Sequence, residues 1–262
     1  MDLENLKKDI WYGEISNDKI ENLKSKLKDV TTEKECFLFI NELLKLGDFS
    51  VKGLLIQLMN STQDEVILNL CTRLFCSIAT HDDLLETNNL NFLSSASEDG
   101  VHTFAASAGE TLSYHVVPYL LTLLEEWEDT FVEKTIRNEL AWMLGIKDEY
   151  YELSIEELGE ICSEFVKNND MKEYYYHNRL SFSGDLVKEL MPRVMISLRE
   201  KTTFDIDTIP STLSIWSGIK CPIQYGTIIT DEKYRELMLY IDSLTKKEWK
   251  IGEKYFYGHL VV

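Results

Sequence analysis

The chain has 262 residues, of which 44% are hydrophobic, and it carries 27 Lys and Arg against 45 Asp and Glu, a formal net charge of −18. This length and apolar content are sufficient for a substantial core. The excess of acid disfavours free nucleic acid and anionic membranes as partners, because both are bound mainly through Lys and Arg. The same charge attracts basic proteins and speeds their capture.

Only 4 Pro and 12 Gly are present, which favours a helical protein over an all-β or disordered one. The 5 Cys are scattered and odd in number, so they indicate reduced thiols rather than a disulfide framework. The first residues are acidic, and no stretch approaches the roughly 20 apolar residues of a membrane span. We therefore expect a cytoplasmic protein.

Two helical patterns open the chain, at residues 17–27 and 31–46. Thr32 and Glu35 have the spacing of a capping box at the start of the second pattern, and Gly47 follows its last apolar residue. The sequence thus predicts two consecutive helices.

Three amphipathic helical patterns follow, each with one apolar stripe, and a shorter leucine-rich stretch precedes each of them. The amphipathic patterns cover residues 64–79, 101–112 and 132–144, and the leucine-rich stretches cover residues 53–58, 84–93 and 118–124. Pro118 suits the first turn of a helix, where its missing N–H costs nothing. A short helix followed by a longer amphipathic one every 30 to 35 residues or so is typical of stacked helical hairpins.

Residues 17–146 resemble the HEAT-like repeat proteins, with Asp64-Glu65-Val66 and Leu140-Ala141-Trp142-Met143-Leu144-Gly145 similar to parts of their repeat. The resemblance implies an all-α, HEAT-like stack of helical hairpins. An irregular helical bundle is the alternative, since all amphipathic helices share this periodicity.

The remainder of the chain is more mixed. After an acidic aromatic link at 147–152, we expect a capped helix at 154–167 and a helix at 183–199 that Pro192 kinks or breaks near residue 190. Residues 202–230 indicate loops with one or two short strands, followed by a helix at 231–244 and an extended aromatic tail. We predict a helical repeat domain at 1–199 and a small mixed cap at 200–262 that contains loops, one helix and short strands.

Common catalytic motifs are missing from the sequence: it contains no glycine-rich phosphate loop, nucleophile elbow or His-Glu-x-x-His. Cys71 and Cys76 have no second ligand pair at a matching spacing, which argues against zinc. We therefore predict no catalytic residue, no metal and no cofactor.

Two groups of residues keep an enzyme with a site outside known motifs as an alternative. His81 precedes Asp82 and Asp83, and Glu110 lies near His115. Both groups also have a structural interpretation. His81 can be a cation next to the C-terminal carbonyls of a helix, and His102 and His115, which flank Glu110, are too far apart in sequence to lie on one helical turn.

Acidic clusters that contain aromatic residues are the main candidates for a binding surface. Carboxylates would steer a basic protein and the rings would anchor it, although solvated turns with a ring in the core have the same composition. The partner-binding candidates are Glu125, Glu126, Trp127, Glu128 and Asp129, then Asp148, Glu149, Tyr150, Tyr151 and Glu152, and finally Tyr174, Tyr175 and Tyr176. If the three tyrosines lie on a helix, at least one should be exposed.

An acidic, all-helical, HEAT-like protein without an active site resembles the immunity proteins of bacterial toxin systems, including contact-dependent inhibition. The segments Trp216-Ser217-Gly218-Ile219-Lys220-Cys221-Pro222 and Tyr255-Phe256-Tyr257-Gly258-His259 add to this resemblance. It implies a protein that binds and neutralises a cognate toxin domain, which we expect to be basic and nuclease-like. A scaffold that holds a peptide or subunit is the alternative.

Overall fold

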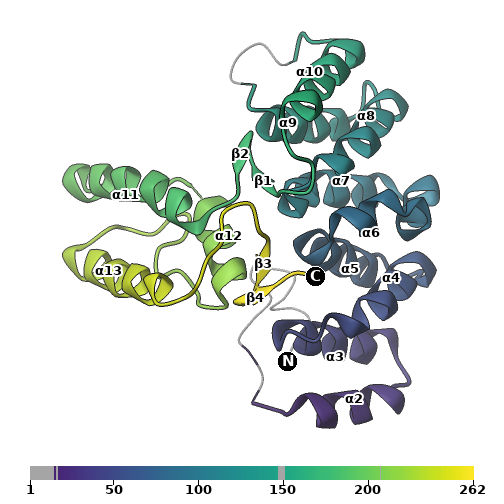
Figure 1. Ribbon diagram of the computed structural model, residues 1–262, viewed down its shortest axis with the longest axis horizontal. Coiled ribbons are helices and arrows are strands. Elements are labelled where there is room, and N and C mark those ends of the chain that lie inside the picture. Colours follow the sequence, from purple (N-terminus) through teal and green to yellow (C-terminus); the bar gives the residue numbers. More distant parts are fainter. Residues whose placement is uncertain (1–14, 16, 147–150, 207) are drawn as a thin grey trace.

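The computed structural model describes residues 15, 17–146, 151–206 and 208–262. This part of the chain is all-α with a small mixed C-terminal part, which confirms the expected fold class. Helices α2 to α10 form a stack, and a second group of helices, α11 to α13, projects from one side of it (Figure 1). Two short hairpins lie between the stack and the second group.

The helices of the stack alternate between two rows. Helices α3, α5, α7 and α9 pack on one another in succession, and the helices between them in the chain cover their other side. The stack comprises α2 (Ile20–Lys28), α3 (Glu33–Lys45), η1 (Phe49–Val51), α4 (Lys52–Ser61), α5 (Glu65–Ile78), α6 (His81–Leu85), η2 (Thr87–Ser95), α7 (Glu98–Ser107), η3 (Ala108–Thr111), η4 (Tyr114–Val116), α8 (Val117–Glu126), α9 (Phe131–Leu144) and α10 (Ile155–Asn168).

Side-chain caps start several of these helices. The Ser154 hydroxyl and the Glu157 carboxylate form a complete capping box at α10. At α3 the Thr32 hydroxyl accepts from the Glu35 N–H at 3.2 Å, but the Glu35 carboxylate accepts from the Thr32 hydroxyl instead of the backbone, so half of the expected box forms. Pro118 lies in the first turn of α8, as expected.

Two of the predicted helical stretches are interrupted. Residues 84–93 divide between α6 and the 3₁₀ helix η2, which is kinked at Leu90. The pattern at 101–112 ends as an α-helix at Ser107 and continues as η3. A Cβ at Gly109 in η3 would lie 2.1 Å from Glu139 Oε1 and 2.6 Å from Trp142 Cζ3. Only glycine therefore lets this turn approach α9 so closely.

The second group contains α11 (Ser183–Glu200), α12 (Thr208–Ser217) and α13 (Asp231–Thr245). Pro192 was expected to kink this helix or to break it near residue 190. It does not break it: α11 continues through Pro192, which lies on the exposed side, where water can bond the carbonyl that the proline leaves free. Helix α11 packs against α12 and α13, and the division of the chain into domains at 1–199 and 200–262 stays a prediction.

The expectation of loops and strands was also wrong for α12. Nearly all of its side chains are buried, so its sequence shows no apolar stripe with helical period. Within residues 202–230 the described strand pairing is one isolated bridge between Thr203 and Ile228.

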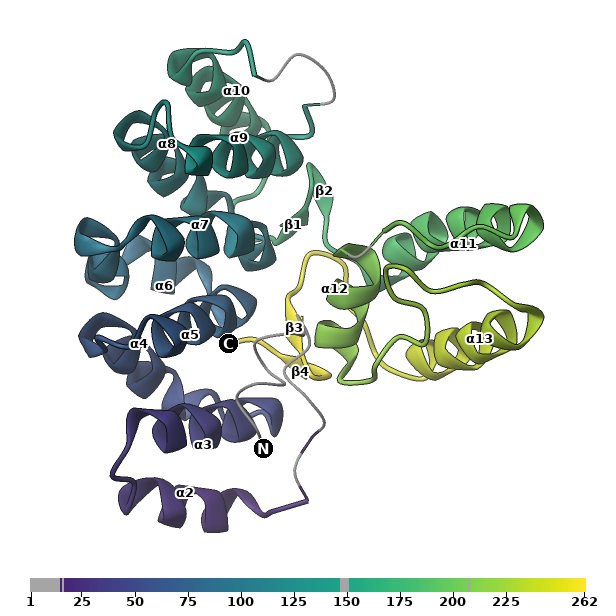
Figure 2. The ribbon, with the colours of Figure 1, turned by 180° about the vertical axis from the view of Figure 1, so that it is seen from behind.

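Two antiparallel hairpins join the two groups of helices: β1 (Tyr175–Tyr176) pairs with β2 (Arg179–Leu180), and β3 (Tyr255–Phe256) pairs with β4 (His259–Leu260). They are linked to each other, because the Tyr174 N–H donates to the Gly252 carbonyl at 2.8 Å and the Gly252 N–H to the Ser181 carbonyl at 2.9 Å. Figure 2 shows both hairpins between the stack and α12. None of the helices in the described ranges is long and apolar enough to cross a membrane.

Candidate functional site

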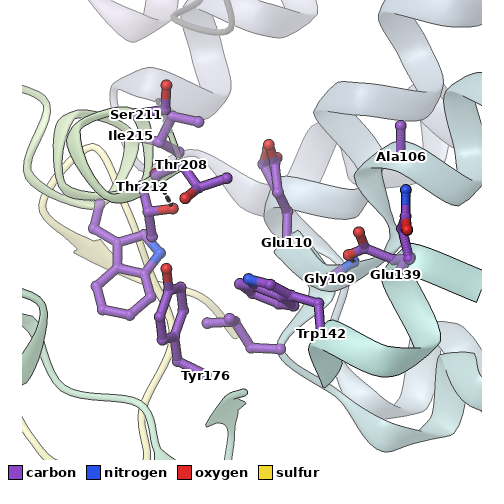
Figure 3. A pocket seen from close by; sticks show the side chains of 14 residues that line it. Ala106, Gly109, Glu110, Glu139, Trp142, Tyr176, Thr208, Ser211, Thr212 and Ile215 are labelled. Carbon is purple, nitrogen blue, oxygen red and sulfur yellow. Dashed lines mark hydrogen bonds between the residues drawn. The ribbon is translucent and has the colours of Figure 1, made fainter. Parts of the chain in front are cut away.

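A cavity of about 320 Å³ opens between the stack and α12. Figure 3 shows Glu110, Glu139 and Trp142 on the stack side of this space and Thr208 and Thr212 of α12 on the other. We call it the α9–α12 pocket; its lining residues are Ser77, Ala106, Gly109, Glu110, Leu112, Asn138, Glu139, Trp142, Tyr176, Thr208, Ser211, Thr212, Ile215 and Trp216.

Two carboxyl groups line the stack side of the pocket. Glu110 Oε2 accepts a hydrogen bond from the Ser77 hydroxyl, and Glu139 Oε1 accepts from the Gly109 N–H at 2.7 Å. The second oxygen of each carboxyl receives no hydrogen bond from the part of the chain that the structure describes. The pocket is therefore lined by two carboxyl groups, each with one oxygen that no described residue bonds.

Burial in the pocket changes the acidity of both groups. Loss of solvation and, to a smaller extent, the nearby Glu110 raise the pKa of Glu139 to about 8, although the hydrogen bond from the Gly109 N–H opposes this shift. Burial also raises the pKa of Glu110, although the Ser77 hydrogen bond and the charges of Arg73 and Lys254 oppose this shift. At neutral pH Glu139 is thus largely protonated.

Three aromatic rings form a continuous wall of the pocket. The Trp142 and Tyr176 rings meet edge to face with centroids 4.9 Å apart, and the Tyr176 and Trp216 rings do so at 6.4 Å. Burial raises the pKa of the Tyr176 hydroxyl, and the Thr208 side chain opposes this shift. The three residues come from α9, β1 and α12, so the wall exists only when the hairpin and α12 pack on the stack.

Helix α9 connects this pocket to the first predicted acidic cluster. Phe131, Asn138 and Trp142 are spaced at i, i+7 and i+11, which places them on one face of α9, and Phe131 and Asn138 are exposed. The helix begins beside the turn Glu125–Asp129 and its second half lines the pocket. Tyr151 extends this face, because its hydroxyl donates to Asn138 Oδ1 at 2.7 Å.

In the first acidic cluster, Glu125 and Glu126 end α8, and Glu128 and Asp129 lie in the turn, all with exposed side chains. Trp127 is half-buried and packs against the core. The exposed aromatic residue here is Phe131, 60% exposed, which the sequence analysis did not select. The sequence does contain a feature that could have identified Phe131, because this residue lies outside the apolar stripe of its own helix.

The second cluster falls partly outside the described residues, which do not include Asp148, Glu149 and Tyr150. Tyr151 is 47% exposed, and Glu152 is exposed beside it. We call the turn Glu125–Asp129, the face of α9 from Phe131 to Trp142, and Tyr151 together the α9 surface.

The third candidate, Tyr174 to Tyr176, forms a hairpin strand and the residue before it rather than a helix. All three side chains are buried, since the hairpin packs between the stack and the second group. Tyr174 stacks on His81 at 4.2 Å, and Tyr175 packs edge to face on Tyr114 at 5.8 Å. Tyr176 alone of the three lines the pocket.

The histidines considered for catalysis have structural partners. His81 Nδ1 lies 2.7 Å from the Ser113 hydroxyl and Nε2 lies 3.2 Å from the Lys172 carbonyl, and burial lowers the pKa of His81 to about 4. His115 packs against His81 with ring centroids 5.5 Å apart and does not line the pocket with Glu110. Asp83 caps α6 and binds Lys52 at 2.7 Å.

The described residues contain no cluster of three or more His, Cys, Asp or Glu side chains that could hold a metal ion. The five cysteines are free thiols, and four of them are buried.

The sequence was compared with known families, curated proteins and solved structures. The model of the family described as Immunity protein 47 matches residues 6–261. No curated protein and no solved structure matches the chain. Since the family match extends over nearly the whole sequence, the chain belongs to the Immunity protein 47 family.

Proposed function

We propose that this protein is a stoichiometric, non-enzymatic inhibitor that meets a basic, nuclease-like toxin domain in the cytoplasm and binds it through the α9 surface. The family gives the protein a toxin-neutralising role with a cognate toxin as its partner. The basic character of that toxin, its nuclease-like class and the HEAT-like nature of the stack are our own predictions.

The observation that carries the proposal is the exposed face of α9, which begins at an acidic turn and ends at a pocket. Glu125, Glu126, Glu128 and Asp129 stand together at the turn, in a chain of net charge −18. A surface of this kind accelerates association with a basic protein, because complementary potentials steer the encounter. Nuclease domains expose basic surface for nucleic acid, so such a surface is the expected counterpart.

Affinity requires apolar contact in addition to charge. Phe131 and Tyr151 provide exposed rings on the α9 surface, and Trp142 provides a third, half-buried ring at the pocket. Aromatic residues that become desolvated at the centre of an interface contribute most of the binding energy in typical complexes. Acid at the rim and rings at the centre therefore match what a basic partner needs.

The test uses the cognate toxin domain, to be identified among the genes adjacent to this one. Co-expression should rescue growth of cells that produce the toxin, and the purified proteins should associate more slowly as salt increases. Failure of rescue together with absence of binding would overturn the proposed function.

Charge variants locate the surface. We expect the double variant Glu125→Lys/Glu128→Lys to lower the association rate about tenfold or more at low salt, and Lys134→Glu on the same helix to raise it. The control is Glu160→Lys/Glu164→Lys, which makes the same charge change at two exposed positions of α10. Equal rates for the two double variants would exclude the acidic turn as the contact surface.

A further inference from the structure

We infer that the α9–α12 pocket receives one basic side chain of the toxin, a lysine or an arginine, between the carboxyl groups of Glu110 and Glu139 and the rings of Trp142, Tyr176 and Trp216. This inference rests on the proposed function, since it names the chemistry of the contact that the toxin makes.

The carboxyl groups provide the first reason. Ser77 and Gly109 each occupy one oxygen of a different carboxyl, and the described residues leave the second oxygens without a donor. An ammonium or guanidinium group is rich in donors and has no acceptor, so it satisfies two such oxygens at once. A neutral amide or hydroxyl has fewer donors and no charge to pair with an ionised carboxyl, and an anionic group would be repelled by one.

The aromatic wall provides the second reason. Trp142, Tyr176 and Trp216 follow one another with edge-to-face contacts along one side of the same cavity. The face of an aromatic ring attracts a cation within about 6 Å of its centroid, and the attraction strengthens when water is excluded. Rings beside carboxyls therefore favour an organic cation over an apolar side chain.

Size and position provide the third reason. A cavity of about 320 Å³ lies at the lower end of the range for ligand sites, roughly 300–1,000 Å³. It therefore suits a single side chain better than a folded segment. Asn138 and Trp142 belong both to the pocket lining and to the exposed face of α9, so a protein on the α9 surface reaches the pocket without a second docking site.

Entry of a cation should change the protonation of Glu139. In the empty pocket burial keeps this carboxyl largely protonated at pH 7, because its pKa is raised to about 8. A neighbouring positive charge favours the ionised form. Binding should therefore release a proton, which a merely structural role for Glu139 would not produce.

The experiment is calorimetric titration of the purified toxin domain into the protein at pH 7, in two buffers of different ionisation enthalpy. The variants are Glu139→Gln and Glu110→Gln, and the matched control is Glu160→Gln, which makes the same substitution of carboxyl by amide at an exposed site on α10. We expect affinity to fall about tenfold or more for each pocket variant and to change little for the control. Proton release should be present in the wild type and absent in Glu139→Gln.

The outcomes separate this inference from the proposed function. If wild type binds and rescues, but both pocket variants bind like the control without any change in proton release, the inference is overturned and the proposed function stands. If wild type neither binds nor rescues, the proposed function fails. The pocket is then tested alone by titration with N-acetyl-L-arginine amide, with tryptophan fluorescence as the readout.

A change in the fluorescence of the wild type that Glu139→Gln abolishes supports a cation site, and no change in the wild type overturns it. Thermal melts establish that the variants are folded.

Discussion

The Lys254 ammonium group donates a hydrogen bond of 2.8 Å to the carbonyl of Cys76, a residue 178 positions earlier in the chain. It also donates to the carbonyls of Ala79 at 2.9 Å and Thr111 at 3.2 Å. The side chain is 1% exposed, so a lysine in the C-terminal segment satisfies backbone carbonyls at the end of α5 and in η3.

The contact of Lys254 with the stack is linked to the α9–α12 pocket through the second hairpin, which contains β3 and β4. Beyond β3, the Tyr257 and Gly258 N–H groups donate to the carbonyls of Ile215 and Trp216 in α12, each at 2.7 Å. The segment that Lys254 fixes to the stack therefore also holds α12. The two sides of the pocket are thus connected by one short stretch of chain.

We expect Lys254→Met to destabilise the protein by about 3 kcal/mol, because it leaves three buried carbonyls without their donor while roughly preserving side-chain volume. Urea unfolding followed by circular dichroism measures the loss. The control is Lys246→Met, which removes an exposed lysine paired with Asp242 and should change stability by no more than about 0.5 kcal/mol. Equal losses would refute the role given to Lys254.

Stability should depend on pH through Glu139. Its pKa is raised from 4.5 to about 8 in the folded protein, so the folded state binds more protons than the unfolded state between these values. The stability that Glu139 contributes is therefore complete below pH 4.5 and is lost as pH rises through 8. Glu139→Gln cannot titrate, and relative to this variant the wild type should lose at least about 1 kcal/mol between pH 5 and pH 8. Parallel curves of unfolding free energy against pH would contradict the buried, protonated state.

Lys254 changes the pH dependence of stability in the opposite direction to Glu139, and over a higher pH range. Its pKa is lowered from 10.5 to about 7 by burial, so the unfolded state binds more protons between pH 7 and 10.5, and its contribution to stability rises with pH there. The effect of Glu139 is therefore best measured as a difference between variants that both retain Lys254.

Much of the helical stack was predictable from the sequence because its helices are amphipathic. The stripe of α5, for example, includes Ile67, Leu70 and Leu74, and all three are buried. Helix α12 was not predictable in this way, since burial on all sides removes the period on which such a prediction depends. For a similar reason the burial of Tyr174 to Tyr176 was not predictable, because it depends on the tertiary contacts of a hairpin.

The site was predictable in part. Charge and composition pointed to the turn Glu125–Asp129, and this turn is exposed. The pocket was not predictable, because its residues are distant in sequence: Glu110 and Glu139 meet through the packing of α9 on η3, and Trp216 joins them through the packing of α12 on the stack. Glu110 had been considered with His115 for catalysis, but its neighbours in the fold are Ser77 and the pocket.

Phe131→Ala should weaken toxin binding about tenfold or more and leave stability nearly unchanged, because the ring is 60% exposed in the free protein and should become desolvated in the complex. Surface plasmon resonance measures the affinity, with the difference expected mainly in the dissociation rate. Tyr225→Ala is the matched control, since this tyrosine is 69% exposed but lies in the loop before α13. Unchanged affinity for Phe131→Ala would remove Phe131 from the proposed interface.

Gly109→Ala should distort the α9–α12 pocket, because the new methyl group would clash with two residues that line it. The added Cβ would lie 2.1 Å from Glu139 Oε1 and 2.6 Å from Trp142 Cζ3, so both side chains must move from the positions that shape the cavity. We expect a destabilisation of about 1–3 kcal/mol and weaker toxin binding at temperatures where the variant remains folded. Gly53→Ala is the matched control: within α4 the added Cβ meets nothing within 4 Å, so it should stabilise the helix by up to about 1 kcal/mol without affecting affinity. If Gly109→Ala binds the toxin as tightly as Gly53→Ala, the shape of the pocket is irrelevant to recognition.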